Sequence, residues 1–153
     1  MLSDLEYADS YFQGGLFVRR DYLSTNRKEV CAFVLGISKG VEFTFENPEA
    51  AIRIHWKIYP ESKPKGRSEA EALEFSLAVL RSRMYKWDPS DELVKKHGAY
   101  SHEEWMKIVE LMGLRGKVTD RMVRSLYNTD GVDCGSDCDH QKVREEARNY
   151  RLR

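Results

Sequence analysis

Residues 47–66, with the sequence NPEAAIRIHWKIYPESKPKG, contain the start and the end of one helix and so decide how the chain is organised. Asn47 can accept a hydrogen bond from a free backbone N–H group, and Pro48 fits the first helical position, where no N–H is needed. Pro60 and Pro64 prevent the helix from continuing. Between these limits, residues that can form one apolar and aromatic face recur at spacings of three and four, namely Ala51, Ile52, His55, Trp56 and Tyr59. We expect that face to be buried.

Two further amphipathic segments lie on either side of residues 47–66 in the sequence. The first predicts a helix from about residue 27 to residue 45, with an apolar stripe at Val30, Phe33, Val34, Ile37, Val41 and Phe45. Gly36 and Gly40 would let another backbone approach that helix closely. In the second segment, Ser68 and Glu71 form the pattern of a capping box. The helix that they open carries a regular stripe at Ala70, Leu73, Leu77, Leu80, Met84 and Trp87. We expect it to pack within one domain, because the stripe is too short for a coiled coil.

Three helices are predicted after residue 100. Ser101 and Glu104 repeat the capping-box pattern, and the helix that follows ends at Gly113. Thr119 is expected to cap a helix over residues 120–127. A polar loop with the sequence NTDGVDCGSDCDH then leads to a last helix, and its inward side chains are expected to be Val143, Ala147 and Tyr150.

The segment LFVRR at residues 16–20 predicts a short β-strand, because its side chains alternate between two faces. A single strand is not stable alone and needs partners from elsewhere. Together with the helices, this segment predicts a fold that is mainly α with one or two short strands. We expect residues 1–153 to form a single domain, in which residues 27–153 are helical.

The amino-acid composition limits which classes of binding partner the chain is expected to have. The chain has 153 residues, of which 41% are hydrophobic and 33% are charged, as is ordinary for a globular protein. Lys plus Arg equals Asp plus Glu at 25 each, so no overall charge favours nucleic acid or an anionic membrane. The N-terminal sequence MLSDLEYADSYF lacks the basic start and apolar run of a signal peptide. As written, the chain is expected to be cytoplasmic.

The sequence gives one interpretation for Cys31 and leaves three open for Cys134 and Cys138. Cys31 falls on the apolar side of its helix and is expected to be a buried free thiol. Cys134, Cys138 and His140 could supply three ligands to a zinc ion, although no second Cys or His pair accompanies them. Cys134 and Cys138 could instead form a disulfide in an oxidising compartment. The interpretation that we favour is an inert, solvated loop with no metal and no cofactor.

The familiar catalytic motifs are absent from the sequence. It contains no glycine-rich phosphate loop, no G-x-S-x-G elbow and no H-E-x-x-H. His55 is expected to be a hydrogen-bonded core histidine, because no Ser, Cys or acid is spaced to work with it. We therefore expect a protein that is not an enzyme, with a metal-dependent enzyme as the least favoured hypothesis.

Several segments, taken in order, resemble the C-terminal part of an ABC-transporter substrate-binding protein of the NMT1/THI5-like branch. The resemblance runs from about Ser10 to Tyr150, and N-P-E-A-A followed by W-K-x-x-P-E-S is its most specific piece. The segments that carry it are LFVRRDYL, KGVEFTFENPEAAIRIHWKIYPESKP, EALEFSLAVLRSRMYKW, YSHEEWMKIVELMG and DHQKVREEARNY.

This resemblance implies a solute-binding role. Members of the family are periplasmic, fold into two α/β lobes and deliver small solutes such as thiamine precursors, sulfonates or nitrate to an ABC permease. In them, residues 1–20 would form the segment that returns to the first lobe together with its strand. The ligand-binding residues that the resemblance implies here are Tyr11, Phe12, Gln13 and Gly14. Tyr11 or Phe12 could stack on a planar ligand, and Gln13 could donate an orienting hydrogen bond.

A second hypothesis is a free-standing helical module, derived from such a gene, that serves in oligomerisation or interaction. The resemblance covers only the last part of the family's fold, whose helices pack on a sheet supplied by other residues. The chain would then expose apolar faces, and we expect it to self-associate as a homo-oligomer.

Overall fold

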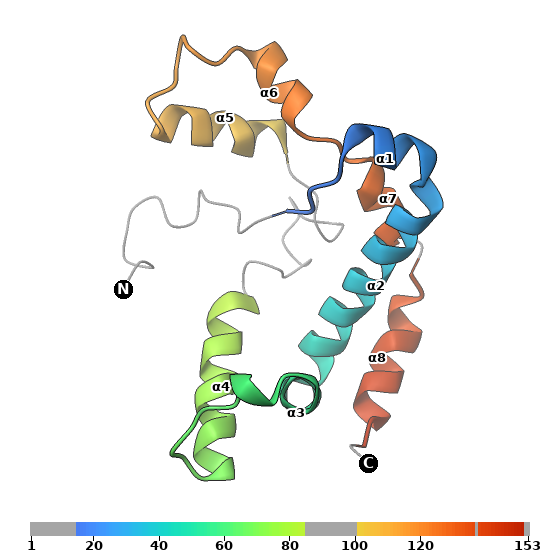
Figure 1. Ribbon diagram of the computed structural model, residues 1–153, viewed down its shortest axis with the longest axis vertical. Helices are drawn as coiled ribbons and strands as arrows, with labels where there is room; N and C mark the ends of the chain where they lie inside the picture. The colour runs from blue at the N-terminus through green and yellow to red at the C-terminus, as the bar shows by residue number, and fades with distance from the viewer. Residues whose placement is uncertain (1–14, 85–100, 137, 152–153) are drawn as a thin grey trace.

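The computed structural model describes residues 15–84, 101–136 and 138–151, and helices dominate these ranges (Figure 1). The helices are α1 (Arg20–Thr25), α2 (Arg27–Glu46), α3 (Pro48–Ile58), α4 (Glu69–Met84), α5 (His102–Leu111), α6 (Asp120–Leu126), α7 (Asp130–Ser136) and α8 (His140–Asn149), with a 3-10 turn, η3 (Pro60–Ser62), after α3. The mainly helical fold class expected from the sequence is confirmed.

The expected strand at residues 16–20 is wrong. Residues 15–19 have no regular secondary structure, and Arg20 begins α1. No β-strand occurs anywhere in the described ranges, so the segment finds no strand there to share its backbone hydrogen bonds. Its side chains are exposed instead, and Phe17 is 96% exposed.

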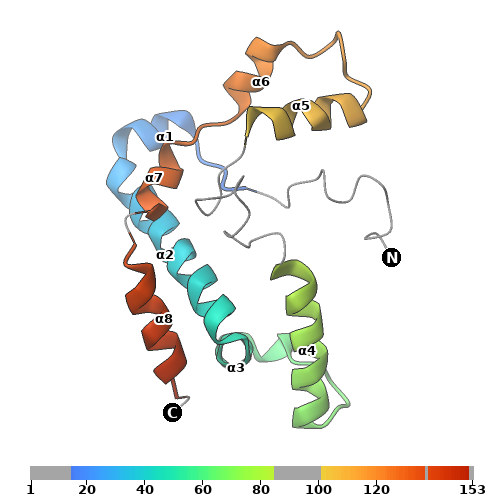
Figure 2. The same cartoon turned by 180° about the vertical axis from the view of Figure 1, so that it is seen from behind.

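Helix α2 is the longest described helix, and α7 and α8 pack along it (Figures 1 and 2). A disulfide between Cys31 and Cys134 joins α2 to α7. Gly131 lies against Val34, since a side chain at Gly131 would meet Val34 Cγ2 at 3.7 Å. The sequence predicted a loop where α7 lies, because its glycines lower helix propensity. Contact with α2 and the disulfide compensate for that low propensity.

The buried face of α2 differs from the expected apolar stripe. Phe33 is 62% exposed, and Ile37 is 39% exposed. Ser38 and Glu42 are buried in their place, at 1% and 3% exposure. No described residue makes the expected close approach at Gly36 and Gly40, because a Cβ at either glycine would meet none of them within 4 Å. Helix α2 therefore turns a partly polar face to its described partners.

Helix α3 links these helices to α4. Asn47 Oδ1 accepts a hydrogen bond from the backbone N–H of Ala50 at 3.1 Å, as predicted, and Asn47 Nδ2 donates to the carbonyl of Ala147 in α8 at 2.8 Å. The buried face of α3 meets α4 in a small core of Ile52, Trp56, Ala72, Leu73, Leu77 and Leu80. His55, predicted to be a core histidine, is exposed and lies 5.1 Å from the ring of Tyr59.

Helices α5 and α6 form a separate hairpin at one end of the molecule (Figure 1). The predicted capping box at Ser101 and Glu104 is present with both of its hydrogen bonds. Gly113 ends α5 with a φ of 65°, a left-handed conformation that favours glycine. Thr119 caps α6 as predicted, by accepting from the N–H of Met122 at 3.3 Å.

Candidate functional site

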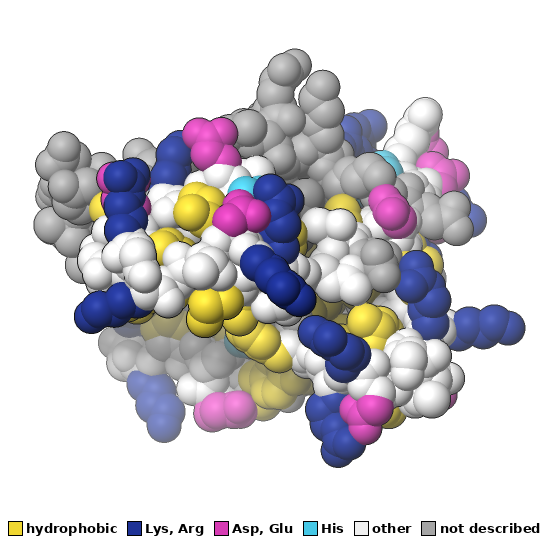
Figure 3. Space-filling model, turned by 90° about the horizontal axis from the view of Figure 1, so that it is seen from above, with side chains coloured by type: hydrophobic (Ala, Val, Ile, Leu, Met, Phe, Trp, Pro, Cys, Tyr) yellow, Lys and Arg dark blue, Asp and Glu magenta, His cyan; other side chains and the backbone are white. Residues whose placement is uncertain are grey.

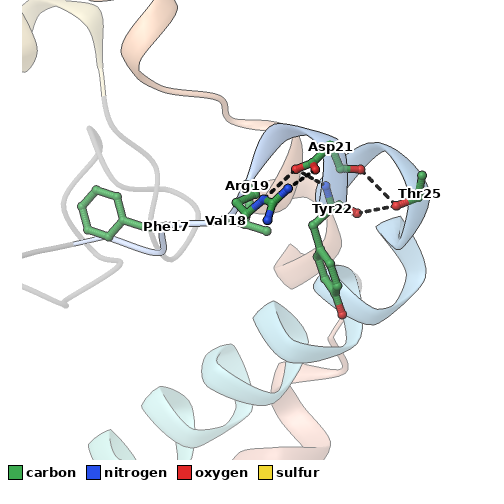
Figure 4. Close-up of a pocket in the computed structure, with 6 residues that line it drawn as sticks. All are labelled: Phe17, Val18, Arg19, Asp21, Tyr22 and Thr25. Atoms are coloured by element: carbon green, nitrogen blue, oxygen red, sulfur yellow. Dashed lines mark hydrogen bonds and ion pairs between the residues drawn. The ribbon is translucent and has the colours of Figure 1, made fainter.

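An open pocket of about 500 Å³ lies where the extended residues 15–19 meet α1 (Figure 4). Six side chains or backbone segments line it, at Phe17, Val18, Arg19, Asp21, Tyr22 and Thr25. In Figure 4 the Phe17 ring stands apart from the others, while the Tyr22 ring points along α1 toward α2. The pocket thus has two aromatic rings with a polar group between them.

An ion pair forms that polar group. Arg19 Nε donates to Asp21 Oδ1 at 3.0 Å, and a second hydrogen bond joins Arg19 Nη2 to Asp21 Oδ2. Asp21 Oδ1 also accepts from the backbone N–H of Tyr22 at 2.9 Å. The Arg19 hydrogen bonds, followed by the one from Tyr22, hold the pKa of Asp21 below its usual value. The pair presents both a cation and an anion to solvent, with no net charge.

Tyr22 anchors the pocket to α2. Its Oη donates to Glu29 Oε2 at 2.6 Å, which fixes the ring direction. This hydrogen bond, followed by the negative charge of Glu29, raises the pKa of Tyr22, so the phenol stays neutral at physiological pH. Thr25 Oγ1 donates to backbone carbonyls of α1, at 3.0 Å to Asp21 and 3.3 Å to Tyr22. The lining contains no His, Cys or Lys, so its chemistry suits binding by stacking and hydrogen bonding.

The sequence-predicted ligand residues Tyr11, Phe12, Gln13 and Gly14 lie outside the described residues. The pocket begins three residues after Gly14, with Phe17. Sequence reasoning assigned Phe17 and Val18 to a strand and gave no role to Tyr22. The signal that it missed is a pair of aromatic residues five positions apart, Phe17 and Tyr22, on either side of an Arg-x-Asp, in the sequence FVRRDY.

A second polar cluster lies between α2 and α8. Glu42, with its side chain 4% exposed, accepts hydrogen bonds from Arg144 Nε at 2.7 Å and from His140 Nδ1 at 3.0 Å. One turn further along, Arg148 Nε donates to Glu46 Oε1 at 2.6 Å. These bonds to Glu42 raise the pKa of Arg144, and the bond to Glu46 raises the pKa of Arg148. The cluster fastens two helices together.

The cysteine predictions need correction. Cys31 is not a free thiol, because it is bonded to Cys134, and the alternative Cys134–Cys138 disulfide is absent. Cys138 is the buried free thiol, and burial raises its pKa. The proposed ligand set of Cys134, Cys138 and His140 is therefore not assembled. Across the described part of the chain, no group of three or more His, Cys, Asp or Glu is placed to hold a metal ion.

A third cluster joins α5 to α6. His102 Nε2 lies 2.5 Å from Asp120 Oδ1, and His102 Nδ1 lies 3.3 Å from Tyr127 Oη. Tyr127 also stacks on Trp105, with ring centroids 5.7 Å apart. The pKa of Asp120 is lowered, chiefly by its hydrogen bond from Arg124 and then by His102. These contacts join the first turn of α5 to both ends of α6.

Comparisons of the chain with protein-family models, with curated proteins and with solved structures found no match. Among the described helices, none combines the length and the apolar character needed to cross a bilayer.

Proposed function

We propose that this chain is the C-terminal part of a non-enzymatic solute-binding protein that serves an ABC permease. The observation that carries the proposal is the position of the pocket, which continues the segment Tyr11, Phe12, Gln13 and Gly14 named by the family resemblance. The residues that line the pocket would form one wall of the ligand site.

The chemistry of the pocket supports a small, planar and polar solute. Phe17 offers an exposed ring for stacking, and the Arg19–Asp21 pair can exchange its internal hydrogen bonds for bonds to a polar ligand. Thiamine precursors combine a planar ring with hydrogen-bonding groups, and sulfonates or nitrate would engage Arg19 alone. The ring of Phe17 favours the first class over the others.

The disulfide between Cys31 and Cys134 also supports the proposal. Disulfides persist in oxidising compartments such as the bacterial periplasm and are rare in the cytosol. Solute-binding proteins of ABC uptake systems work in that compartment, so we propose a periplasmic location.

A ligand screen tests the proposal. Thermal unfolding of the full chain is followed with pyrimidines, sulfonates, nitrate and aromatic acids, and a binder is then titrated by calorimetry. Phe17→Ala should weaken binding by about tenfold through the loss of stacking. Phe33→Ala, which removes another exposed ring, in α2, is the control and should bind normally. The proposal is contradicted if no ligand in the screen binds saturably. It is also contradicted if Phe17→Ala leaves the affinity of the ligand unchanged.

A second candidate function is an oligomerisation or interaction module. It is favoured by large apolar side chains that are more than one third exposed on α1, α2, α3, α4 and α6, among them Tyr22, Phe33, Ile58, Phe75 and Leu126. Figure 3 shows hydrophobic side chains reaching the surface between Lys and Arg side chains on one face. Exposed apolar surface on several helices is typical of proteins that bind other polypeptide chains. A flat ligand screen together with concentration-dependent assembly would favour this module.

A further inference from the structure

Helix α4 carries apolar side chains on two opposite faces. Leu73, Leu77 and Leu80 pack toward the core that α4 shares with α3. Phe75 and Val79 lie on the other side of the helix and are 46% and 49% exposed. A helix that covers only one layer is normally polar on its outer face. Figures 1 and 2 both show α4 at the edge of the molecule, with α3 on its inner side, so no described helix covers the outer face.

The outer face has the spacing of a helix–helix seam. Glu71, Phe75, Ala78 and Ser82 are all exposed, and they follow one another at intervals of four, three and four residues. This is the interval pattern of positions that meet a second helix in a left-handed pair. The order of these intervals is the same from either end of the helix. An antiparallel pairing of two identical helices about a two-fold axis requires this symmetry.

Charge along α4 favours the antiparallel direction. Glu74 and Arg81 are exposed and flank the seam on the same side, because seven residues make about two helical turns. They stand about 10 Å apart along the helix axis, which is too far for them to pair with each other. Neither side chain forms an ion pair with another residue of the described ranges.

We propose that two copies of this chain associate through α4 in an antiparallel, two-fold symmetric contact. That contact places Glu74 of each copy beside Arg81 of the other, so two ion pairs form by symmetry. Phe75 and Ala78 of the two copies meet in the centre of the contact, with Val79 beside them. A parallel pairing would instead set Glu74 of one copy beside Val79 of the other, so neither Glu74 nor Arg81 would gain a partner of opposite charge there.

The size of the contact sets its strength. Helix α4 has 16 residues and is about 24 Å long, so the seam spans only about two heptads. Its apolar centre is a single aromatic ring and two small side chains from each copy. A dissociation constant on the order of micromolar is expected for so limited an interface.

Sedimentation velocity of the full chain over a micromolar concentration series tests the pairing. The parent chain should pass from monomer to dimer. Glu74→Arg and Arg81→Glu should each raise the dissociation constant by about tenfold, since each replaces two attractions with two repulsions. Glu61→Arg, which makes the same charge change on η3, is the control and should dimerise like the parent chain. Circular dichroism confirms that each variant is folded.

Exchanging the charges of Glu74 and Arg81 is the more decisive test. An equimolar mixture of the Glu74→Arg chain and the Arg81→Glu chain should recover the parent affinity as a heterodimer, because every cross-copy pair is again of opposite sign. The double variant E74R/R81E should recover it within one chain. A parent chain that stays monomeric throughout overturns the proposal, and so does a dimer that these single variants leave unchanged or that neither mixing nor the double variant restores.

Discussion

Arg144 of α8 donates its Nε hydrogen to Oε2 of Glu42 in α2 across 2.7 Å, although the Glu42 side chain is only 4% exposed. The two residues are 102 positions apart in the sequence. A buried carboxylate is stable as an anion only where cations and donors surround it, and His140 Nδ1 provides a second contact at 3.0 Å. This pairing, with the hydrogen bond that the Asn47 side-chain amide donates to the Ala147 carbonyl, determines where α8 lies on α2.

We expect Glu42→Gln to destabilise the fold. The substitution keeps the shape of the side chain but removes the charge that Arg144 and His140 face. Because the Arg144 side chain is 46% exposed and can be hydrated, the cost should be about 2 kcal/mol, below that of breaking a fully buried pair. Urea unfolding followed by circular dichroism measures it. Glu146→Gln, on the exposed side of α8, is the control, and an equal effect of both variants would contradict the assignment.

The disulfide between Cys31 and Cys134 should be a large contributor to stability. It spans 103 residues, and the loss of chain entropy in the unfolded state corresponds to about 4.7 kcal/mol for a loop of that length. Cys31→Ser should therefore lower the free energy of unfolding by up to that amount. A reducing agent should produce the same loss in the parent chain and none in Cys31→Ser.

Cys138→Ser separates this pairing from the alternative between Cys134 and Cys138. The variant should keep its disulfide and its sensitivity to reducing agent, since Cys138 is a free thiol in the structure. Peptide mapping by mass spectrometry that recovered Cys134 bonded to Cys138 would show the pairing to be wrong.

Local signals in the sequence predicted the starts of α3, α4, α5 and α6 correctly. Asn47, Ser68, Ser101 and Thr119 each accept the backbone hydrogen bond expected of a cap. Such bonds join residues three positions apart, so the residues needed to predict them are adjacent in the sequence. The strand at residues 16–20 failed for the opposite reason, because a strand depends on partners that its own sequence does not contain.

The face of α2 could not be predicted from periodicity. Periodicity placed Phe33 in the apolar stripe and gave no buried role to Glu42 or Ser38. In the structure Glu42 and Ser38 are buried and Phe33 is exposed. The reason is that the partners of Glu42 lie on α8, about a hundred residues later in the sequence. The disulfide has the same origin, since its two cysteines are brought together by tertiary packing alone. In the pocket, likewise, the role of Tyr22 depends on its bond to Glu29.

The capping box of α5 predicts a measurable coupling. Ser101→Ala leaves the N–H of Glu104 without its acceptor, and Glu104→Ala does the same to the N–H of Ser101. Each variant should cost about 1 kcal/mol in urea unfolding. The double variant should cost less than the sum, because either change disturbs both bonds. Ser125→Ala, whose hydroxyl caps no helix, is the control. Strict additivity would argue against a reciprocal cap.

The exposed pair of Glu46 and Arg148 predicts how stability changes in acid. The hydrogen bond from Arg148 is the main reason that the pKa of Glu46 lies below its usual value of 4.5. A carboxylate with a lowered pKa in the folded state contributes stability above the unfolded value, and the contribution is lost as the pH falls through the folded pKa. The advantage of the parent chain over Arg148→Gln should therefore be constant from neutral pH down to about 4.5 and shrink at lower pH.

Urea unfolding of both chains across this range measures the difference. Added salt should reduce it at neutral pH, because the pair is accessible to solvent. Arg151→Gln, which removes a cation just beyond α8, is the matched control and should show no such acid-dependent loss. A difference between the parent chain and Arg148→Gln that stayed constant below pH 4, or that grew there, would mean that Arg148 stabilises α8 by packing of its stem and not through the charge of Glu46.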